Sequence, residues 1–120
     1  KKWFQSDLET YNKISEIVAN AEVINDNIAI SIYEKEDADA NVTCAKAADE
    51  LLTISNITAS FVIGKMGDKI CISGRSIGDI NVQVILEKLG GGGQIEGMTQ
   101  EEVKQELIIR INEYFTEVGC

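Results

Sequence analysis

The sequence has 120 residues, a net charge of −9, no proline and no histidine. This length fits one domain, and the negative charge argues against a protein that holds a long nucleic acid through its phosphates. The lack of histidine excludes histidine-based acid–base catalysis and nearly all zinc sites, and no apolar stretch approaches the ~20 residues that cross a membrane. Since residue 1 is lysine and not methionine, we expect residues 1–120 to be one domain excised from a larger protein.

The first predicted element is a helix. Ser6-Asp7-Leu8-Glu9 has the pattern of a capping box, and the apolar residues that follow recur at helical spacing. The pattern predicts a helix that begins at Ser6 and ends near Ala21. Trp3 precedes this start. We interpret it as packing on the first helical turn or on a removed neighbouring domain, in preference to stacking on a nucleic-acid base.

Two short apolar runs come next and flank an Asn-Asp-Asn cluster. The runs are Glu22–Ile24 and Ile28–Tyr33, and this pattern is typical of a β-hairpin. The segment from Glu34 to Asn41 is acidic. Its Asp37 and Asp39 are interpreted as solvated side chains in preference to metal ligands, because a single acidic loop is usually solvated.

A second helix and a second hairpin are expected in the middle of the chain. Asn41 or Thr43 is placed to cap the helix, whose small alanines would allow close packing. Residues 59–64 and 69–73 read as strands on either side of a Met-Gly-Asp turn. We therefore expect these two segments to pair.

Two more helices are expected in the last part of the chain. Asp79 follows the breaker Gly78 and is interpreted as the N-cap of a helix that ends at the glycine run Gly90–Gly93. Thr99-Gln100-Glu101-Glu102 is a second capping box and opens the last helix. Strands that alternate with helices predict a single domain of the α/β (α+β) class. We expect a central mixed β-sheet of about four to five strands with helices packed on it.

The three cysteines, Cys44, Cys71 and Cys120, are odd in number and show no CxxC spacing. The first two fall in an apolar helical face and in a strand, so buried free thiols are predicted there. Cys120 is terminal and is expected to be exposed. Free thiols fit a reducing compartment, and we expect the domain to be cytoplasmic.

The run Gly90–Gly93 is the feature most informative about function. One glycine suffices to end a helix, whereas several in a row allow close backbone approach and can point N–H groups at phosphate oxygens. The alternative is a flexible linker between two helices. Residues 61–93 carry four basic and three acidic side chains and are the only part of the sequence that is not acidic. Arg75 lies in this part, which favours a small anionic ligand.

Three motifs occur in an order that resembles a known family. They are Ile72-Ser73-Gly74-Arg75-Ser76, Asn81-Val82-Gln83-Val84-Ile85, and Glu87-Lys88-Leu89 running into the glycines. Over nearly residues 7–94 the chain resembles the DHH-associated domain of the DHH phosphoesterase superfamily. The resemblance is greatest to its GdpP-type branch, the membrane-bound cyclic-di-AMP phosphodiesterases.

The resemblance implies a substrate, a partner and a location. In that family a catalytic DHH domain holds two manganese ions on Asp and His ligands, and the associated domain closes over the nucleotide. The resemblance therefore implies a dinucleotide substrate, an intramolecular catalytic domain as the partner, and a parent protein tethered to the cell membrane. No cofactor and no catalytic residue are expected in this chain, and the manganese is expected in the absent catalytic domain. Whether the domain forms a homodimer is left open.

The resemblance also implies a set of substrate-binding residues. Arg75 would contact a phosphate or a base, the hydroxyls of Ser73 and Ser76 would lie beside it, and Asn81 would help to position the ligand. The backbone N–H groups of the glycine run would hold phosphate oxygens. The predicted site residues are Ser73, Arg75, Ser76, Asn81, Gly91, Gly92, Gly93 and Gln94.

Two features depart from the family pattern. The family's glycine run is followed by histidine and here by Gln94, which forms hydrogen bonds but cannot carry a proton or a positive charge. The family's next strand is expected to be missing or much shortened, because residues 94–97 lead straight to the cap at Thr99. Two alternatives therefore stay open. One is a degenerate, non-catalytic nucleotide sensor or interaction module, and the other is a domain that binds single-stranded nucleic acid or oligoribonucleotides.

Overall fold

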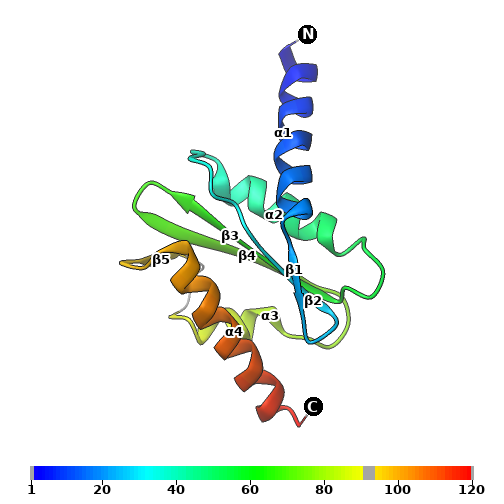
Figure 1. The fold of residues 1–120 in the computed structure, drawn as a ribbon, viewed down its shortest axis with the longest axis vertical. Coiled ribbons are helices and arrows are strands. Elements are labelled where there is room, and N and C mark those ends of the chain that lie inside the picture. The colour runs from blue at the N-terminus through cyan, green and yellow to red at the C-terminus, as the bar shows by residue number, and fades with distance from the viewer. Residues whose placement is uncertain (1, 91–93, 120) are drawn as a thin grey trace.

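The computed structural model describes the backbone of residues 2–90 and 94–119, and the side chains of residues 8–90 and 95–119. Its elements are, in chain order, α1 (Lys2–Ala19), β1 (Glu22–Ile24), β2 (Ile28–Ile32), α2 (Ala40–Leu51), β3 (Ala59–Met66), β4 (Lys69–Ser76), α3 (Val82–Glu87), β5 (Gln94–Glu96) and α4 (Gln100–Glu117). Helix α1 projects beyond one sheet around which the other helices are arranged (Figure 1). The predicted α/β single domain with a central mixed sheet is confirmed.

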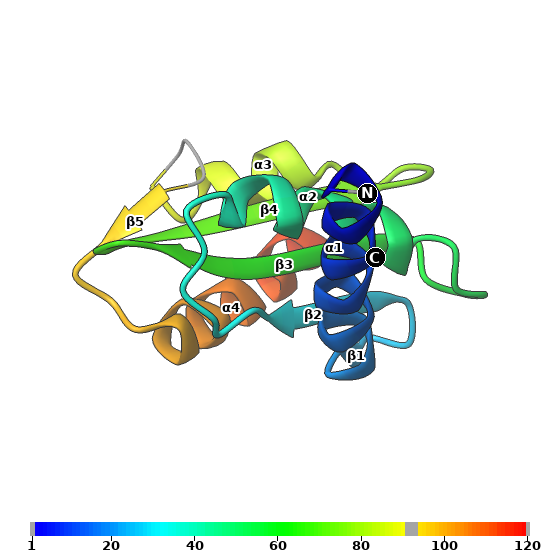
Figure 2. The ribbon, with the colours of Figure 1, turned by 90° about the horizontal axis from the view of Figure 1, so that it is seen from above.

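The five strands lie side by side in the order in which they occur in the chain. Strands β2 and β3 run parallel, with Ile28 opposite Ala59, and the other three pairs are antiparallel. Parallel neighbours need a crossover connection, and α2 lies within it. Figure 2 shows β5 at one end of the sheet, away from α1.

Strand β3 supplies both halves of the core. Phe61 and Ile63 pack with residues of α3 and α4, whereas Val62 packs with residues of α1 and α2. This division follows from the alternation of side chains along a strand. All residues from Ala59 to Gly64 are buried, as expected for a central strand that is covered on both faces.

Two buried serines of the sheet hold the helices of the α1–α2 face. Ser60 donates a hydrogen bond to the carbonyl of Ala48 in α2 at 2.7 Å, and Ser31 donates to the carbonyl of Ile17 in α1 at 2.6 Å. A buried hydroxyl left without a partner would cost about 1–3 kcal/mol. These two bonds therefore favour one position of each helix along the sheet.

Both predicted hairpins are confirmed. Asn25 and Asp26 have φ angles of 53° and 69°, as a type I′ turn between β1 and β2 requires. The second hairpin is longer than predicted, because β3 and β4 pair over their full lengths and close at Met66 and Lys69. Gly67 stands in the two-residue loop with a φ of 61°, a conformation that glycine adopts without strain.

The predicted starts of α1 and α2 are wrong. Helix α1 is already helical at Lys2, so Ser6 lies inside it, and it ends at Ala19. No glycine or proline precedes Ser6, and a formed helix extends readily through such residues. Helix α2 begins after Asp39, so neither predicted cap stands at its start.

The predicted start of α3 is also wrong, whereas that of α4 is confirmed. Asn81 and not Asp79 is the N-cap of α3, because the Asn81 side chain accepts a hydrogen bond from the N–H of Val84 at 3.2 Å. At α4 the capping box is complete. The Thr99 hydroxyl accepts from the Glu102 N–H at 3.1 Å, and the Glu102 carboxylate accepts from the Thr99 N–H at 2.9 Å.

Asp37 is a structural acceptor and not a solvated side chain, which corrects the interpretation of the acidic loop. Its carboxylate accepts hydrogen bonds from the Tyr33 hydroxyl at 2.9 Å, the Thr43 hydroxyl at 3.2 Å, Lys13 at 3.3 Å and the N–H of Asp39 at 2.9 Å. These bonds join α1, α2 and the end of β2. Within the part of the chain that the structure describes, no group of three His, Cys, Asp or Glu residues is placed to hold a metal ion.

Asp37→Asn is expected to lower the free energy of unfolding by about 1–3 kcal/mol at pH 7. Burial alone would raise the pKa of Asp37, but its four hydrogen bonds outweigh burial and hold the pKa below its usual value. The contribution of the carboxylate is therefore complete above its unfolded-state pKa of about 4 and is lost as the pH falls further. Urea unfolding at pH 7 and pH 3 measures this, with the exposed Asp39→Asn as control. An equal effect of Asp37→Asn at both pH values would contradict it.

The two buried cysteines lie against a strand residue that has no side chain. Cys44 and Cys71 are free and buried, as predicted, whereas Cys120 lies outside the described residues. A Cβ atom added to Gly64 of β3 would lie 2.5 Å from the Cys44 sulfur and 3.1 Å from the Cys71 sulfur. The two sulfurs thus fill the space above this glycine.

Gly64→Ala is expected to lower the free energy of unfolding by about 1–3 kcal/mol, because the new methyl group overlaps the Cys44 sulfur. Adding Cys44→Ala to this variant removes the overlap and should recover part of the loss. Chemical denaturation of the two single variants and the double variant measures the effect. A Gly64→Ala protein as stable as the wild type would show that α2 moves away from the sheet at little cost.

Candidate functional site

The three predicted site residues of β4 divide between the two faces of the sheet. Ser73 and Arg75 share the face of Cys71, which packs with α1 and α2. Ser76 is directed to the other face, where its hydroxyl donates to the carbonyl of Ile80 at 2.7 Å. The structure therefore brings Ser73 and Arg75 together and places Ser76 apart from them.

Ser76 and Asn81 take part in contacts that support the fold. The bond from Ser76 closes the turn before α3, and the Asn81 side chain caps this helix. The backbone N–H of Asn81 donates to the hydroxyl of Tyr114 in α4 at 3.0 Å. These contacts explain the two polar residues without a ligand, and direct contact of either with a nucleotide stays a prediction.

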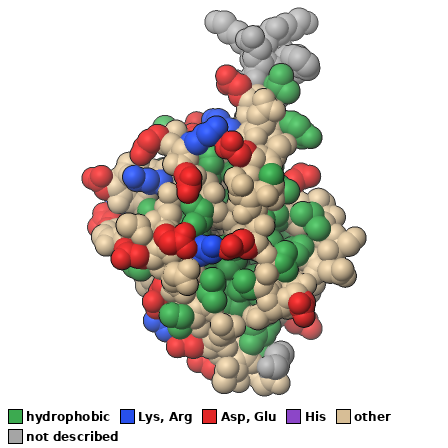
Figure 3. Space-filling view, in the orientation of Figure 1, with side chains coloured by type: hydrophobic (Ala, Val, Ile, Leu, Met, Phe, Trp, Pro, Cys, Tyr) green, Lys and Arg blue, Asp and Glu red, His purple; other side chains and the backbone are tan. Residues whose placement is uncertain are grey.

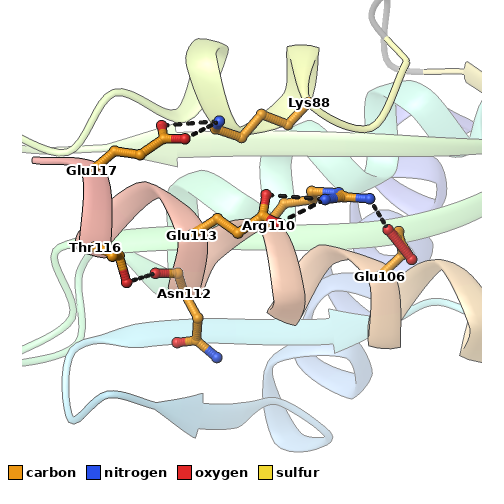
Figure 4. A network of polar contacts seen from close by, with 7 residues as sticks. All are labelled: Lys88, Glu106, Arg110, Asn112, Glu113, Thr116 and Glu117. Atoms are coloured by element: carbon orange, nitrogen blue, oxygen red, sulfur yellow. Dashed lines mark hydrogen bonds and ion pairs between the residues drawn. The ribbon is translucent and has the colours of Figure 1, made fainter.

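Arg75 is half-exposed, and protein acceptors fix one part of its guanidinium. Its Nε lies 3.1 Å from a carboxylate oxygen of Asp49 in α2, and its Nη1 donates to the carbonyl of Gly74 at 2.9 Å. The other arginine of the chain, Arg110, is bound on both sides by glutamates of its own helix α4 (Figure 4). Arg75 is therefore the guanidinium better placed to meet an anion.

The chain that follows the glycine run pairs with β4. Gly91–Gly93 and the side chain of Gln94 lie outside the described residues. The backbone of Gln94 begins β5 directly opposite Cys71, two residues from Ser73 along β4. Beyond this pairing, β4 continues to Ser76. Gln94, the first residue after the run, is thus placed beside β4 and near Ser73 along the strand.

Strand β5 decides between the two alternatives expected for the segment after the glycines, because the strand is present but only three residues long. Its three residues pair antiparallel with Lys69–Cys71, and Gly97, with a φ of 83°, turns the chain toward α4. A strand of three residues is too short to show an alternating pattern in sequence. The pairing is therefore visible only in three dimensions.

A cleft of about 450 Å³ lies at the other edge of the sheet, between α1, β2 and the start of α4, and contains none of the predicted site residues. Its two lysines are engaged by glutamates, since Lys35 pairs with Glu16 at 3.3 Å and Lys104 pairs with Glu22. Acidic side chains are spread over the face seen in Figure 3, with basic side chains between them. With three glutamates and two lysines in its lining, the cleft does not favour an anion.

The model of the DHHA1 domain family matches residues 25–117. The chain belongs to this family. The match spans β2 to β5 and all of α4, so it includes every predicted site residue and confirms the family that the motifs predicted. None of the helices in the described ranges combines the length and the apolar character that a membrane span needs.

The relatives of this DHHA1 domain include enzymes that act on a cyclic dinucleotide. The chain is 39% identical to the cyclic-di-AMP phosphodiesterase GdpP of Geobacillus thermodenitrificans and 37% identical to the cyclic-di-AMP phosphodiesterase PdeA of Listeria monocytogenes. Each match covers 96% of this chain and 19% of the relative, so the chain spans about a fifth of these proteins. An exopolyphosphatase-related protein from Bacteroides fragilis matches with a TM-score of 0.67 and 22% identity over 91% of this chain and 35% of that chain, a likeness of fold alone.

Asp49 and Tyr114 contact two of the predicted site residues and were not identified from sequence. Asp49 contacts Arg75 from α2, and Tyr114 contacts Asn81 from α4. In sequence, Asp49 stands among the alanines and leucines of an ordinary helix, and Tyr114 reads as one more apolar contact of the last helix. Neither position carries a local pattern that indicates its partner.

Asn81→Ala is expected to lower the free energy of unfolding by about 1 kcal/mol, because α3 loses its N-cap. Asn81→Ser and Asn81→Asp keep an oxygen that can accept the Val84 N–H and should retain most of the stability. Thermal or urea unfolding of the three variants measures the difference. An Asn81→Ala protein with unchanged stability would favour a role in ligand contact over a structural one.

Proposed function

We propose that this DHHA1 domain binds the adenine dinucleotide of a cyclic-di-AMP phosphodiesterase by holding a phosphate group between Arg75 and Ser73. The identity to such phosphodiesterases over 96% of the chain supports the class of substrate. The observation that carries the proposal is the position of Arg75. Its guanidinium is half-exposed, shares a face with Ser73 and lies on the segment of β4 beyond β5.

The chemistry of these groups suits a phosphodiester. A guanidinium forms charge-assisted hydrogen bonds with phosphate oxygens, and its planar shape matches two oxygens at once. The Ser73 hydroxyl adds a neutral donor beside it. In the proposal the N–H groups of Gly91, Gly92 and Gly93 complete the set, and Gln94 supplies a neutral amide where the family has a histidine.

The proposed role is to bind and orient the nucleotide. Hydrolysis is assigned to a separate DHH catalytic domain, where the manganese would activate water, and the parent protein would be tethered to a membrane. Binding through a second domain brings the scissile bond to a defined position, which lowers the entropic cost of reaction. A non-catalytic nucleotide sensor would use the same phosphate site without such a partner.

Arg75→Ala is expected to weaken the binding of cyclic-di-AMP and of its linear dinucleotide product by at least about tenfold, since hydrogen bonds to a charged group contribute about 1.5–3 kcal/mol. Arg110→Ala removes the same charge from α4 and should leave the affinity unchanged. Calorimetric or NMR titration of this chain gives the dissociation constants.

Three results would contradict the proposal or replace it. Equal affinities of the wild type and Arg75→Ala would exclude the site. Robust hydrolysis by this chain with manganese would show that it is more than a binding domain. A wild-type chain that binds no nucleotide would favour an interaction module, and oligonucleotide binding with a steep salt dependence would favour a single-strand binder.

A further inference from the structure

Asp49 is tied to Arg75 through a closed ring of contacts. Arg75 stands directly opposite Ser60 in the β3–β4 pairing, and the Ser60 hydroxyl donates to the carbonyl of Ala48 at 2.7 Å. The next residue, Asp49, returns to Arg75 with 3.1 Å between the carboxylate oxygen and Nε. The buried bond from Ser60 therefore fixes the backbone of α2 at the place from which Asp49 extends.

The acceptors around Arg75 leave a particular part of its guanidinium for a ligand. A guanidinium has five N–H donors in one plane. Asp49 takes the donor of Nε, and the Gly74 carbonyl takes one donor of Nη1. These two contacts leave a second donor on Nη1 and both donors on Nη2, from which a ligand can take one on each nitrogen. This distal pair has the spacing of two oxygens of one phosphate group.

We propose that Asp49 is a positioning residue for the phosphate site, and this inference rests on the function proposed above. Asp49 holds Arg75 through Nε, so that the distal donors face the ligand before it arrives. A flexible arginine would otherwise lose its conformational freedom on binding, and preorganisation removes that cost.

A second role for Asp49, as a negative charge that competes with the phosphate, predicts the opposite result. Direct competition requires the carboxylate to occupy the hydrogen-bond donors that the phosphate needs. Asp49 instead contacts Nε, so a phosphate at the distal donors does not have to displace it. Both side chains are also well exposed, at 43% for Arg75 and 64% for Asp49, so water weakens the repulsion between carboxylate and phosphate.

The first test is a titration of the chain with linear and cyclic adenine dinucleotides. Asp49→Ala is expected to weaken binding about three- to tenfold, which is the effect of freeing one long side chain. Asp49→Glu should restore part of the affinity. Glu50→Ala removes the same charge from the neighbouring exposed position of α2 and should leave the affinity unchanged. In an Arg75→Ala background, Asp49→Ala should cause no further loss, because Asp49 acts through Arg75.

The second test measures the contact between Asp49 and Arg75 directly. The chain has two arginines, so an NMR spectrum of arginine side chains contains two Nε–H signals. Asp49→Ala should shift the signal of Arg75 and speed its exchange with water, whereas the signal of Arg110 stays in place. If Asp49 had a purely structural role, a variant that changes the Arg75 signal would not also change the nucleotide affinity.

The outcomes separate this inference from the proposed function. Asp49→Ala with wild-type or tighter affinity, while Arg75→Ala loses binding, would overturn the positioning role and leave the proposed function intact. A loss from Asp49→Ala of the same size in the Arg75→Ala background would also overturn it. If the wild-type chain binds neither dinucleotide, the proposed function fails, and the positioning role fails with it.

Discussion

Because β2 and β3 run parallel, the chain between them must cross from one end of the sheet to the other, and α2 lies on this crossing. The small residues Ala40, Ala47 and Ala48 are fully buried, so α2 packs closely on the sheet. Its position decides which polar groups meet. Asp49 is brought to Arg75, and Asp37, just before the helix, is brought to the hydroxyls and the lysine that it accepts from. The same crossover therefore supports the core and shapes the candidate site.

The sequence predicted those parts of the fold that short-range chemistry determines. The Asn-Asp turn, the hairpin around Gly67 and the capping box at Thr99 are each set by residues within four positions of one another. The predicted start of α1 was wrong because it also rested on a short-range pattern. A capping pattern at Ser6 is a local preference, and nothing upstream of it stops a helix. The strand order, and which two strands run parallel, could not be predicted, because alternation shows which face a side chain takes but not which strand lies next to it.

The candidate site shows a similar division. Arg75 and Ser73 could be found from sequence, because their motif resembles a family and lies in the least acidic part of the chain. Ser76 and Asn81 belong to the same motifs, yet the structure gives them hydrogen bonds that hold α3 in place. Residues of one motif thus divide between the proposed ligand site and contacts that support the fold. Asp49 contacts Arg75 through the packing of α2 on the sheet, which no local pattern reveals.

The order of the strands also bears on how the chain assembles. Each strand pairs with the one before it, and both hairpins close over short loops, so they can form early from contacts between near neighbours. The pairing of β2 with β3 is different, because Ile28 and Ala59 are far apart in the sequence and α2 lies between them. We expect this docking to limit the folding rate, since the entropy of closing the long connection is lost before its contacts form. The crossover that shapes the candidate site would then also determine the folding rate of the domain.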